Sequence, residues 1–388
     1  MRLLHTADWH LGRTLHGVDL LEAQLAFMAN LVETVESQAV DCVLIAGDVF
    51  DRPIPRVEAV RAYERTLEQL AELTQVIVIS GNHDSAVRLG FAGGLLRPGV
   101  HFATQPEDLG GSVELTDEHG PVIFHPIPYL EPDRLRADPA SPVDSAPRTH
   151  AAAMATAVGR SVPHGGRNGV RRVAVAHAFV AGGSVSESER DIQVGGLGDV
   201  PADVFGPFCY VALGHLHRCQ QVGAPDGTVV QYSGSPLRYS FSETNDSKSF
   251  LIVDIGATGV DTITRIPVDQ PREMATITGP LNEILSPALA AAHRDAWAQV
   301  TVTDEVRPDR LYDQVKQAYP HSLVIRHQPS TVADSRPGTD APADVPSSEL
   351  STIGRFIAET TGTEMTGVER ELIEDVLAAV TGTGEAST

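Results

Sequence analysis

Residues that can bind metal ions follow five short apolar runs of this sequence. They are carboxylates, an amide and imidazoles, and none is a thiol. In chain order they are Asp8, His10, Asp48, Asn82, His83, Asp84, His177, His215 and His217. Each alone has a commoner explanation, since an Asp after a strand often caps a helix and a single His is often a buried structural group. Five such clusters in one chain instead predict a shared site.

The spacing of two pairs supports this prediction. Side chains alternate across an extended backbone, so Asp8 and His10 face the same side, and His215 and His217 repeat that spacing. Open α/β sheets bind ligands at the carboxyl ends of their strands, where all five clusters are expected. These ligand types favour Mn²⁺, Mg²⁺, Fe²⁺ or Zn²⁺. The set is too large for one ion, and two ions about 3.5–4 Å apart, sharing a carboxylate, would suit phosphoryl displacement.

The apolar runs and the stretches between them predict an α/β domain with two sheets. Amphipathic stretches at residues 20–35 and 57–73 have the apolar spacing of helices. Buried strands are expected at residues 2–7, 42–46, 75–80, 172–176 and 209–213. From residue 208 onward hairpins are expected to close the second sheet, and the domain should end near Asp269. The strands of these hairpins are expected at residues 229–232, 250–255 and 260–268.

One stretch inside this domain has a different composition. Residues 132–169 are rich in Pro and Gly, which disfavours regular structure over most of their length. The Ala-rich part at residues 149–158 is expected to form a helix. We therefore expect a surface insertion here.

The rest of the chain divides into three parts. Residues 271–328 suggest a small α+β capping domain in the order helix, strand, helix, strand. Residues 329–348 have almost no large apolar side chains and are expected to be a flexible linker. Residues 349–380 have apolar positions at helical spacing and a capping-box pattern from Thr366 to Glu369. Helices behind a linker favour binding to a partner protein, and the alternative is a hairpin packed on its own domain.

Composition and charge narrow the function classes. The 388 residues are 42% hydrophobic and 21% charged, which predicts folded domains. The net charge of −22 would repel nucleic acid and anionic membranes unless metal ions or a basic partner reverse the sign locally. Three cysteines without a CxxC pair indicate reduced structural thiols, and no apolar run reaches the roughly 18 residues of a membrane helix. Because Asp8 interrupts any signal-peptide pattern, we expect a cytoplasmic protein.

The clusters read in order as D-W-H, G-D-V-F-D, G-N-H-D, A-H and G-H-L-H. This ordered set resembles the calcineurin-like metallophosphoesterase superfamily. Within it, the strings at residues 5–12, 47–51, 213–217 and 233–238 are similar to the SbcD family, the nuclease subunits of bacterial SbcCD complexes. The resemblance implies a two-sheet metallophosphoesterase sandwich flanked by helices, which would form a nuclease domain over residues 1–269.

The resemblance also implies a role for each site residue. The two ligand sets, one for each ion, would be Asp8, His10, Asp48 and His217, and Asp48, Asn82, His177 and His215. Asp48 would bridge the ions, with Mn²⁺ expected first and Mg²⁺ as the alternative. His83 would stabilise the transition state or protonate the leaving 3′ oxygen, and Asp84 would orient His83.

The implied activity is cleavage of DNA in repair, recombination and replication. The chain would be a 3′ to 5′ exonuclease on duplex ends and an endonuclease on single strands and hairpins. Its partner would be an SbcC-type ATPase with a long coiled coil, bound by residues 349–380, since this chain has no G-x-x-x-x-G-K-[ST] loop. A homodimer within a heterotetramer is expected, formed by the region after Gly12 that includes residues 15–25. The complex would be associated with the nucleoid when bound to DNA.

Two other functions stay open. A small-molecule metallophosphodiesterase or nucleotidase would use the same metal ions in a closed pocket, although the cap and the C-terminal helices count against it. A metal-stabilised scaffold for the ATPase would have no need of His83. Comparing the cleavage of DNA with that of small diesters distinguishes a nuclease from the first alternative. A His83→Ala protein that still binds metal but loses cleavage distinguishes an enzyme from the scaffold.

Several residues near the motifs have two interpretations. Three arginines could hold the DNA backbone or form internal ion pairs, namely Arg13, Arg52 and Arg238. Asp51 lies where related nucleases often have a second histidine, and we expect it to be structural. Trp9 is expected to pack beneath the site rather than stack on a nucleotide. His5 and His16 are expected to be structural.

Overall fold

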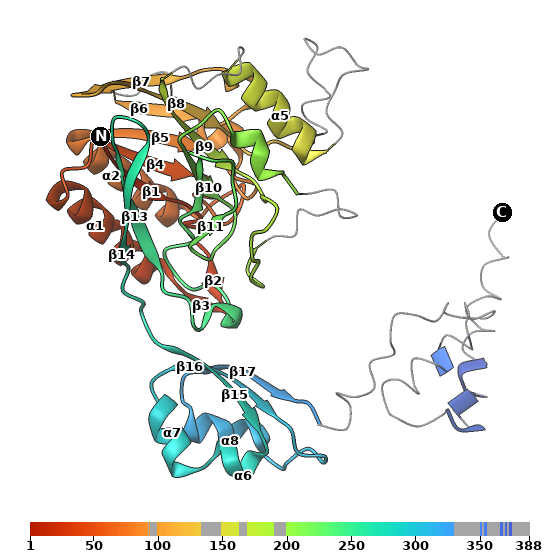
Figure 1. Cartoon of the computed structure of the whole chain (residues 1–388). Coiled ribbons are helices and arrows are strands. Elements are labelled where there is room, and N and C mark those ends of the chain that lie inside the picture. Colours follow the sequence, from red (N-terminus) through yellow and green to blue (C-terminus); the bar gives the residue numbers. More distant parts are fainter. Residues whose placement is uncertain are drawn as a thin grey trace. The chain divides into compact units, whose positions relative to one another are not determined.

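The computed structural model describes most of the chain. The described residues are 1–91, 93, 99–132, 149–162, 169–189 and 199–329, followed by 350, 353–354, 365–367, 369–370 and 372–374. The chain divides into two units, Met1–Ser330 and Thr331–Thr388. The first unit contains two six-stranded sheets and a separate three-stranded sheet (Figure 1).

The first sheet has the strand order β14-β13-β1-β4-β5-β6. Its parallel strands are β1 (Arg2–Thr6), β4 (Cys42–Ala46), β5 (Gln75–Ile79) and β6 (Val100–Ala103). The antiparallel strands β13 (Ser249–Ile255) and β14 (Val260–Pro267) complete it, because β13 pairs with β1. The sequence predicts this hairpin in the second sheet, and that prediction is wrong. Phe250 packs with the helices and Leu251 with the opposite sheet, so β13 is buried on both faces and its pattern does not indicate which sheet it joins.

The second sheet has the order β11-β12-β10-β9-β8-β7. Its strands are β7 (Val113–Asp117), β8 (Gly120–Ile127), β9 (Arg171–His177), β10 (Tyr210–Gly214), β11 (Gln220–Val222) and β12 (Val229–Tyr232). The four central strands are parallel, and the edge strands β7 and β11 are antiparallel to their neighbours. The short elements of this domain are β2 (Thr14–Leu15), β3 (Val18–Asp19), α3 (Ala86–Leu89), η2 (Pro106–Asp108), η4 (Ala202–Phe205) and η5 (Phe241–Glu243).

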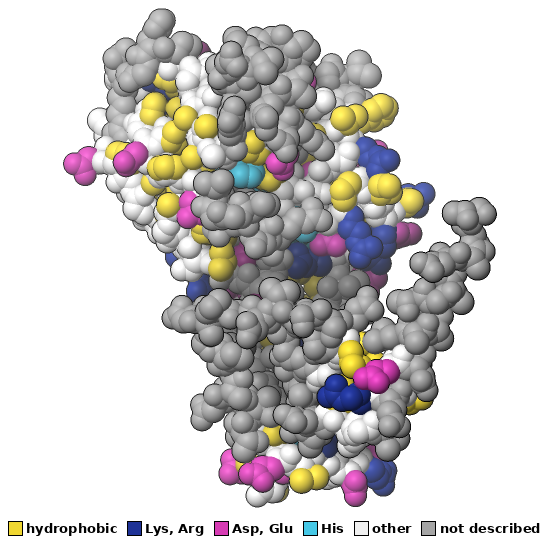
Figure 2. Space-filling view, turned by 90° about the vertical axis from the view of Figure 1, so that its right-hand side faces the viewer, with side chains coloured by type: hydrophobic (Ala, Val, Ile, Leu, Met, Phe, Trp, Pro, Cys, Tyr) yellow, Lys and Arg dark blue, Asp and Glu magenta, His cyan; other side chains and the backbone are white. Residues whose placement is uncertain are grey.

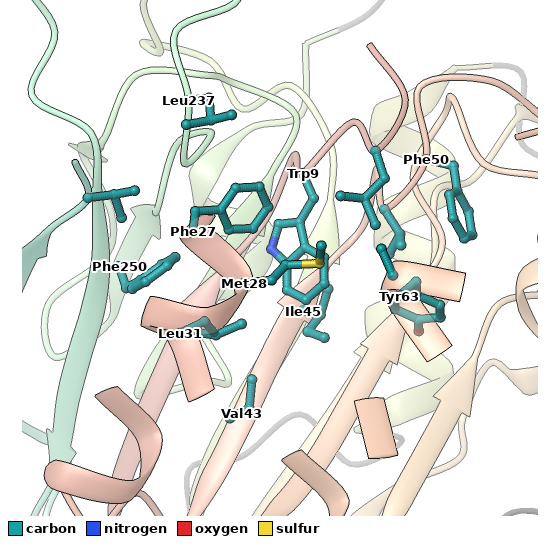
Figure 3. Close-up of a cluster of buried hydrophobic side chains, with 14 of the residues drawn as sticks. Trp9, Phe27, Met28, Leu31, Val43, Ile45, Phe50, Tyr63, Leu237 and Phe250 are labelled. Atoms are coloured by element: carbon teal, nitrogen blue, oxygen red, sulfur yellow. The ribbon is translucent and has the colours of Figure 1, made fainter. Parts of the chain in front are cut away.

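Alternate strand residues divide the core into layers. The long helices are α1 (Leu21–Ser37), α2 (Val57–Leu73) and α5 (His150–Ser161). On one face of the first sheet Val43 and Ile45 pack against α1 and α2 (Figure 3). On its other face Leu44 meets Val173 of the second sheet. Since α5 covers the far face of that sheet, the domain is the predicted two-sheet sandwich flanked by helices (Figure 1).

The insertion predicted at residues 132–169 is only partly a surface feature. The predicted helix is present as α5, and the Thr149 hydroxyl caps its first turn. Ala153 and Ala157 are buried in the core between α5 and the second sheet. The expectation of a surface location is therefore wrong for α5, whose small side chains let the helix approach the sheet closely. The remainder of the insertion lies largely outside the described residues.

The predicted capping domain has its own parallel sheet in the order β15-β16-β17. The strands are β15 (Met274–Gly279), β16 (Trp297–Val302) and β17 (Ser322–His327), and the helices are α6 (Leu281–Ile284), α7 (Pro287–His293) and α8 (Leu311–Ala318). The predicted order of elements begins with a helix, and this is wrong because β15 precedes the first helix. In β15 the polar residues Thr276 and Thr278 alternate with apolar residues. The strand therefore lacks the continuous apolar run by which the other strands are predicted.

The C-terminal unit is described only in short stretches. The predicted linker at residues 329–348 lies outside the described residues except for Pro329. The predicted capping box is present, because the Thr366 amide donates to the Glu369 carboxylate at 2.8 Å and the Glu369 amide donates to the Thr366 hydroxyl at 3.4 Å. The described residues 353–354, 369–370 and 372–374 are helical. None of the described helices combines the length and the hydropathy of a membrane span.

Candidate metal centre

Every metal ligand predicted from the sequence lies at or just after the carboxyl end of a strand. β1, β4 and β5 of the first sheet and β9 and β10 of the second position them. The residues are Asp8, His10, Asp48, Asn82, His177, His215 and His217. Asn82 is partly buried and the others are buried. The loops are tied together by their backbones, since the Asp8 amide donates to the Gly47 carbonyl and the His10 amide to the Asp48 carbonyl, both at 3.0 Å.

Four of these residues have left-handed backbone conformations. The φ angles are 54° at Asp8, 45° at His10, 50° at Asp48 and 106° at His215. Such angles are uncommon for residues other than glycine and cost on the order of 1–3 kcal/mol each. They turn the chain sharply at the end of a strand, so that the ligand side chain points toward the opposing sheet. The surrounding packing therefore stabilises a conformation that these residues would not adopt alone.

Two glycines let the loops come close enough to form the site. A Cβ atom at Gly81 would lie 2.1 Å from Asp48 Oδ1, and one at Gly47 would lie 2.5 Å from His177 Nδ1. Real Cβ atoms do not approach other atoms so closely, and Gly47 also has a φ of 87°. Both positions therefore require glycine, which explains the Gly before the polar residues in the G-D-V-F-D and G-N-H-D motifs.

The first group of ligand atoms comes from Asp8, His10 and His217, which can converge on one ion. The Nε2 atoms of His10 and His217 face each other at 3.0 Å. Two ring nitrogens at this separation repel unless a proton or a cation lies between them. The Asp8 carboxylate accepts the His215 amide at 3.0 and 3.1 Å, which orients Asp8 toward the same point. These donors fit a divalent cation.

The second group lies around Asp48 and Asn82. The oxygen Asn82 Oδ1 is 2.9 Å from His177 Nε2 and 3.2 Å from His215 Nδ1. Asp48 Oδ2 lies 3.6 Å from His177 Nε2 and 3.7 Å from His10 Nε2, so this carboxylate lies between the two groups. Asp8, Asp48 and His177 form a further set that can converge on one ion. The predicted bridging position of Asp48 is therefore consistent with the geometry.

The electrostatics of the site also suit metal ions. Burial lowers the pKa of His10 and His215 well below the ordinary value and the pKa of His177 to about 4, so these imidazoles are neutral near pH 7. Burial and the nearby Asp48 carboxylate raise the pKa of Asp8. Neutral imidazoles and crowded carboxylates are the state that a divalent cation stabilises, because it binds lone pairs and offsets negative charge.

His83 lies at the open side of the ligand cluster, with its ring 4.7 Å from that of His10. Its Nδ1 atom is 2.9 Å from the carbonyl oxygen of Asp51. Asp84, which is expected from the resemblance to orient His83, instead accepts backbone amides from Gly81, Val49 and Phe50 at 2.9–3.1 Å. These contacts do not orient His83. The Asp84 carboxylate instead ties the loops after β4 and β5 together. Burial, with the charge of Asp48, raises the pKa of Asp84 to about 7.

Sequence reasoning missed a polar cluster behind His217. Ser188 Oγ lies 2.5 Å from His217 Nδ1 and 2.5 Å from Glu243 Oε1. Lys248 Nζ lies 2.5 Å from Glu243 Oε2, and both side chains are buried. Burial alone would raise the pKa of Glu243, but Lys248 holds it well below the ordinary value. One signal could have indicated this pair, since Lys248 is one of two lysines in the chain and Glu243 shortly follows the 233–238 string.

The three arginines near the motifs differ in their contacts. Arg13 Nη2 donates to the Ser188 carbonyl at 2.7 Å, and Arg238 Nη1 lies 3.4 Å from the Glu273 carboxylate. Arg52 has a side chain that is 79% exposed and lies 3.5 Å from Asp51. An open pocket of about 320 Å³ is lined by Arg13, Thr14, Asp51, Arg52 and His83. Lys and Arg side chains gather beside a histidine on the face shown in Figure 2, with Asp and Glu among them.

Trp9, His5 and His16 pack against or hydrogen-bond to other residues of the chain. Trp9 is buried between Phe27 and Tyr63 and its ring nitrogen donates to Thr6, so it packs beneath the site as expected (Figure 3). His5 is buried, and its ring nitrogens lie within hydrogen-bonding distance of the Tyr210 hydroxyl and the Leu213 carbonyl oxygen. The ring of His16 stacks on that of Phe241. All three cysteines are free thiols, namely Cys42, Cys209 and Cys219.

Comparison with known proteins yields two family matches and a curated relative. Residues 1–151 match the family model of the calcineurin-like phosphoesterases, and residues 270–352 match the model described as the type 5 capsule protein repressor C-terminal domain. The relative is the D subunit of the nuclease SbcCD from Staphylococcus epidermidis, and it is 30% identical over 328 residues. That alignment covers 84% of this chain and 85% of the relative.

Two solved structures give partial superpositions at low sequence identity. The protein TT1561 of Thermus thermophilus is 11% identical with a TM-score of 0.40, covering 68% of this chain and 98% of that one. A dimetal phosphatase from Danio rerio is 11% identical with a TM-score of 0.38, covering 69% of this chain and 99% of that one.

Proposed function

Since the chain belongs to the SbcD family of nuclease subunits and has the calcineurin-like phosphoesterase fold, we propose that it is a metal-dependent phosphodiesterase that cleaves DNA. It acts as a 3′ to 5′ exonuclease on duplex ends and as an endonuclease on single-stranded and hairpin DNA. The observation that carries the proposal is the convergence of Asp8, Asp48, His10 and His217 beside His83, at the meeting point of both sheets.

Two divalent ions are bound by the two ligand groups described above. Asp8, His10, Asp48 and His217 hold one, and Asp48, Asn82, His177 and His215 hold the other. Oxygen and imidazole donors without a thiol suit Mn²⁺, with Mg²⁺ as the alternative. When bound, the ions neutralise charge on the phosphate and act as Lewis acids toward it.

His83 is the chain's own contribution to the chemical step. Its Nδ1 atom faces the Asp51 carbonyl, which can only accept a hydrogen bond, so Nδ1 carries a proton. The opposite nitrogen, Nε2, is then the atom available to the substrate. In its protonated form His83 can donate from Nε2 to the leaving 3′ oxygen while Nδ1 keeps its bond to Asp51.

DNA approaches over the pocket that contains His83 and Arg52. The exposed Arg52 can contact a phosphate, whereas Arg238 is engaged by Glu273 and the Asp246 carbonyl. The chain's net charge of −22 opposes binding at long range. Bound ions and a basic partner supply the missing positive charge.

The partner is an SbcC-type coiled-coil ATPase, bound by residues 349–380, most of which lie outside the described residues. The capping box at Thr366 supports helix formation in that segment. The complex works in the cytoplasm and joins the nucleoid when bound to DNA. Purified chain and ATPase should form a complex that is lost when residues 349–380 are deleted.

A homodimer is formed through the region after Gly12. Leu15 and Leu20 are buried in the chain's own core and therefore cannot make the contact. Leu25 on α1 and Val57 on α2 are 44% and 59% exposed and are the better candidates. Sedimentation of the full chain and of a Leu25→Glu/Val57→Glu variant tests this, since the variant should be monomeric.

The nuclease proposal is tested with end-labelled duplex, hairpin and single-stranded DNA, in Mn²⁺ and in EDTA, with and without the ATPase. Cleavage should require the metal ion and should be abolished by Asp48→Ala, which removes the carboxylate between the two ligand groups. Asp313→Ala, at an exposed carboxylate on the cap, is the matched control and should leave cleavage unchanged.

The same experiment includes p-nitrophenyl phosphodiesters. Turnover of these small diesters alone, with the ATPase present, would replace the nuclease proposal with a small-molecule phosphodiesterase. Absence of all turnover in a protein that binds Mn²⁺ would favour the scaffold function.

A further inference from the structure

A buried pair of opposite charges lies directly behind His217 and takes no part in the proposed mechanism. Glu243, at the end of η5, is 0% exposed, and Lys248, just before β13, is 4% exposed. Their side chains meet at 2.5 Å. Both follow the 233–238 string, whose chemical purpose the proposed mechanism leaves unexplained. Burying two charges costs several kcal/mol per ion unless their pairing is nearly complete.

The contacts of Lys248 show that the pairing is complete. Its ammonium group donates to Glu243 Oε2 at 2.5 Å, to Ser235 Oγ at 3.0 Å and to the His217 carbonyl at 2.8 Å. An ammonium has three N–H donors, and all three have an acceptor here. Lys248 is therefore charged, and Glu243 is ionised beside it.

The other oxygen of Glu243 is connected to His217 by one hydroxyl. Ser188 Oγ lies 2.5 Å from both Glu243 Oε1 and His217 Nδ1. An ionised carboxylate can only accept, so the Ser188 hydroxyl donates to Glu243. The Ser186 hydroxyl, 2.8 Å away, can also donate to the Ser188 oxygen. Because the single Ser188 proton goes to Glu243, His217 must also donate to that oxygen, which places the ring proton on Nδ1. The lone pair of His217 Nε2 is left pointing toward His10 Nε2, 3.0 Å away.

We propose that Glu243 is a positioning residue which, through Ser188, selects the His217 tautomer that can bind a metal ion. The proposal rests on the proposed function, because His217 is a ligand only if the site holds an ion. Hydrogen-bond partners of ligating histidines commonly fix the tautomer, and their loss typically costs about 10–100-fold in metal affinity. Here the partner is a serine whose own direction is set by a buried ion pair.

The geometry around Ser188 limits other arrangements. Its carbonyl accepts from Arg13 Nη2 at 2.7 Å, and the neighbouring Glu189 carboxylate accepts the His217 amide at 2.7 Å. The loop is thus held at both its backbone and its side chains. Glu243 Oε1 also faces the Tyr239 amide and the Ser240 hydroxyl, each at 3.3 Å, and both are donors. The Tyr239 amide and the Ser240 hydroxyl therefore leave Glu243 Oε1 as an acceptor.

Two substitutions test the proposal in opposite ways. Ser188→Ala removes the connection and leaves the Glu243–Lys248 pair intact. Glu243→Gln keeps the side-chain volume, but the amide oxygen should turn to Lys248 and the NH₂ group to Ser188. The hydrogen bond between residue 243 and Ser188 and the one between Ser188 and His217 should then both reverse their direction. The proton of His217 should then move to Nε2, the position that faces the ions.

The first measurement is the tautomer of His217 in the metal-free full chain, by NMR of ¹⁵N-labelled histidine rings. The signal is assigned by its loss in His217→Gln. Wild type should have the proton on Nδ1, and Glu243→Gln should have it on Nε2. The second measurement is Mn²⁺ binding by calorimetry, in which both variants should weaken one of the two ions about 10–100-fold and leave the other unchanged.

Ser240→Ala is the matched control, because it removes a hydroxyl from the same Glu243 oxygen without touching His217. It should keep both the tautomer and the Mn²⁺ affinities of wild type. An Nε2 proton in metal-free wild type, or wild-type Mn²⁺ affinities in Ser188→Ala, would overturn the proposal. If Glu243→Gln fails to fold, Ser188→Ala decides alone. Wild type that binds no Mn²⁺ but has the Nδ1 tautomer would overturn the proposed function instead.

Discussion

The ring of His83 is held by the main chain of Asp51 and not by the carboxylate of Asp84: its Nδ1 atom lies 2.9 Å from the Asp51 carbonyl oxygen. The carboxylate of Asp84, the next residue along the chain, binds three backbone amides instead. Backbone carbonyls cannot be removed by side-chain substitution. The orientation of His83 should therefore survive changes at Asp51 that would disable a carboxylate–histidine pair.

We expect His83→Ala to lower DNA cleavage by about 10²–10⁴-fold, the usual contribution of a positioned proton donor. Mn²⁺ binding should be retained, because the two ligand groups do not need this ring. Single-turnover cleavage and calorimetry measure the two effects. Asp51→Ala keeps the carbonyl and should lose far less activity. Loss of an ion in His83→Ala would instead show that His83 is a ligand.

We expect Arg52→Ala to weaken DNA binding and to reduce the slope of log K against log salt by about 1, as for loss of one phosphate contact. Turnover of p-nitrophenyl phosphodiesters should not change, since these substrates do not extend beyond the metal ions. Binding is measured by fluorescence anisotropy at several salt concentrations. Arg56→Ala is the control, because Asp19 already pairs with Arg56 at 2.7 Å. Equal effects of both substitutions would contradict a specific role for Arg52.

The sequence predicts where the candidate metal-binding side chains gather for a physical reason. Fully buried parallel strands are continuous apolar runs, and the polar residue that ends each run marks the edge of the sheet where ligands bind. Asp8, Asp48 and His177 are found in this way. The same reasoning cannot assign β13 to a sheet, since both of its faces are buried. It also misses β15, whose alternating pattern is weak.

Contacts between distant segments are harder to predict than ligands. Ser188 and Glu243 are 55 positions apart and belong to no spacing pattern, yet their side-chain oxygens lie 2.5 Å apart beside the ring of His217. The resemblance implies that Asp84 orients His83, its neighbour in the sequence. Three backbone amides compete for the Asp84 carboxylate, and they can be located only after the loops have folded.

We expect Gly81→Ala to disable the metal centre without changing any ligand. The added Cβ would lie 2.1 Å from Asp48 Oδ1 and 2.4 Å from the Asp48 amide, so Asp48 must move. Mn²⁺ affinity should fall at both ions, and DNA cleavage should fall by at least about 10²-fold, the cost of a small misplacement in a preorganised site. Gly223→Ala is the control, because among the described residues only its chain neighbours come within 4 Å of the added Cβ. Wild-type affinity in Gly81→Ala would contradict the close packing of these loops.

We expect His125→Leu to stabilise the protein against acid. His125 on β8 is buried, and neither ring nitrogen has a hydrogen-bond partner in the part of the chain that the structure describes. Burial lowers the pKa of His125 to about 4. The unfolded chain binds this proton below about pH 6.5, whereas the folded chain does not, so wild type loses stability as the pH falls from about 6.5 to about 4.

The leucine variant has no such proton to bind, and its advantage over wild type should therefore grow by about 2 kcal/mol between about pH 8 and pH 5. Urea unfolding at several pH values measures the difference, in which all other titrating groups cancel. A constant offset between His125→Leu and wild type across this range would mean that His125 is protonated equally in the folded and unfolded chains, and that burial does not lower its pKa.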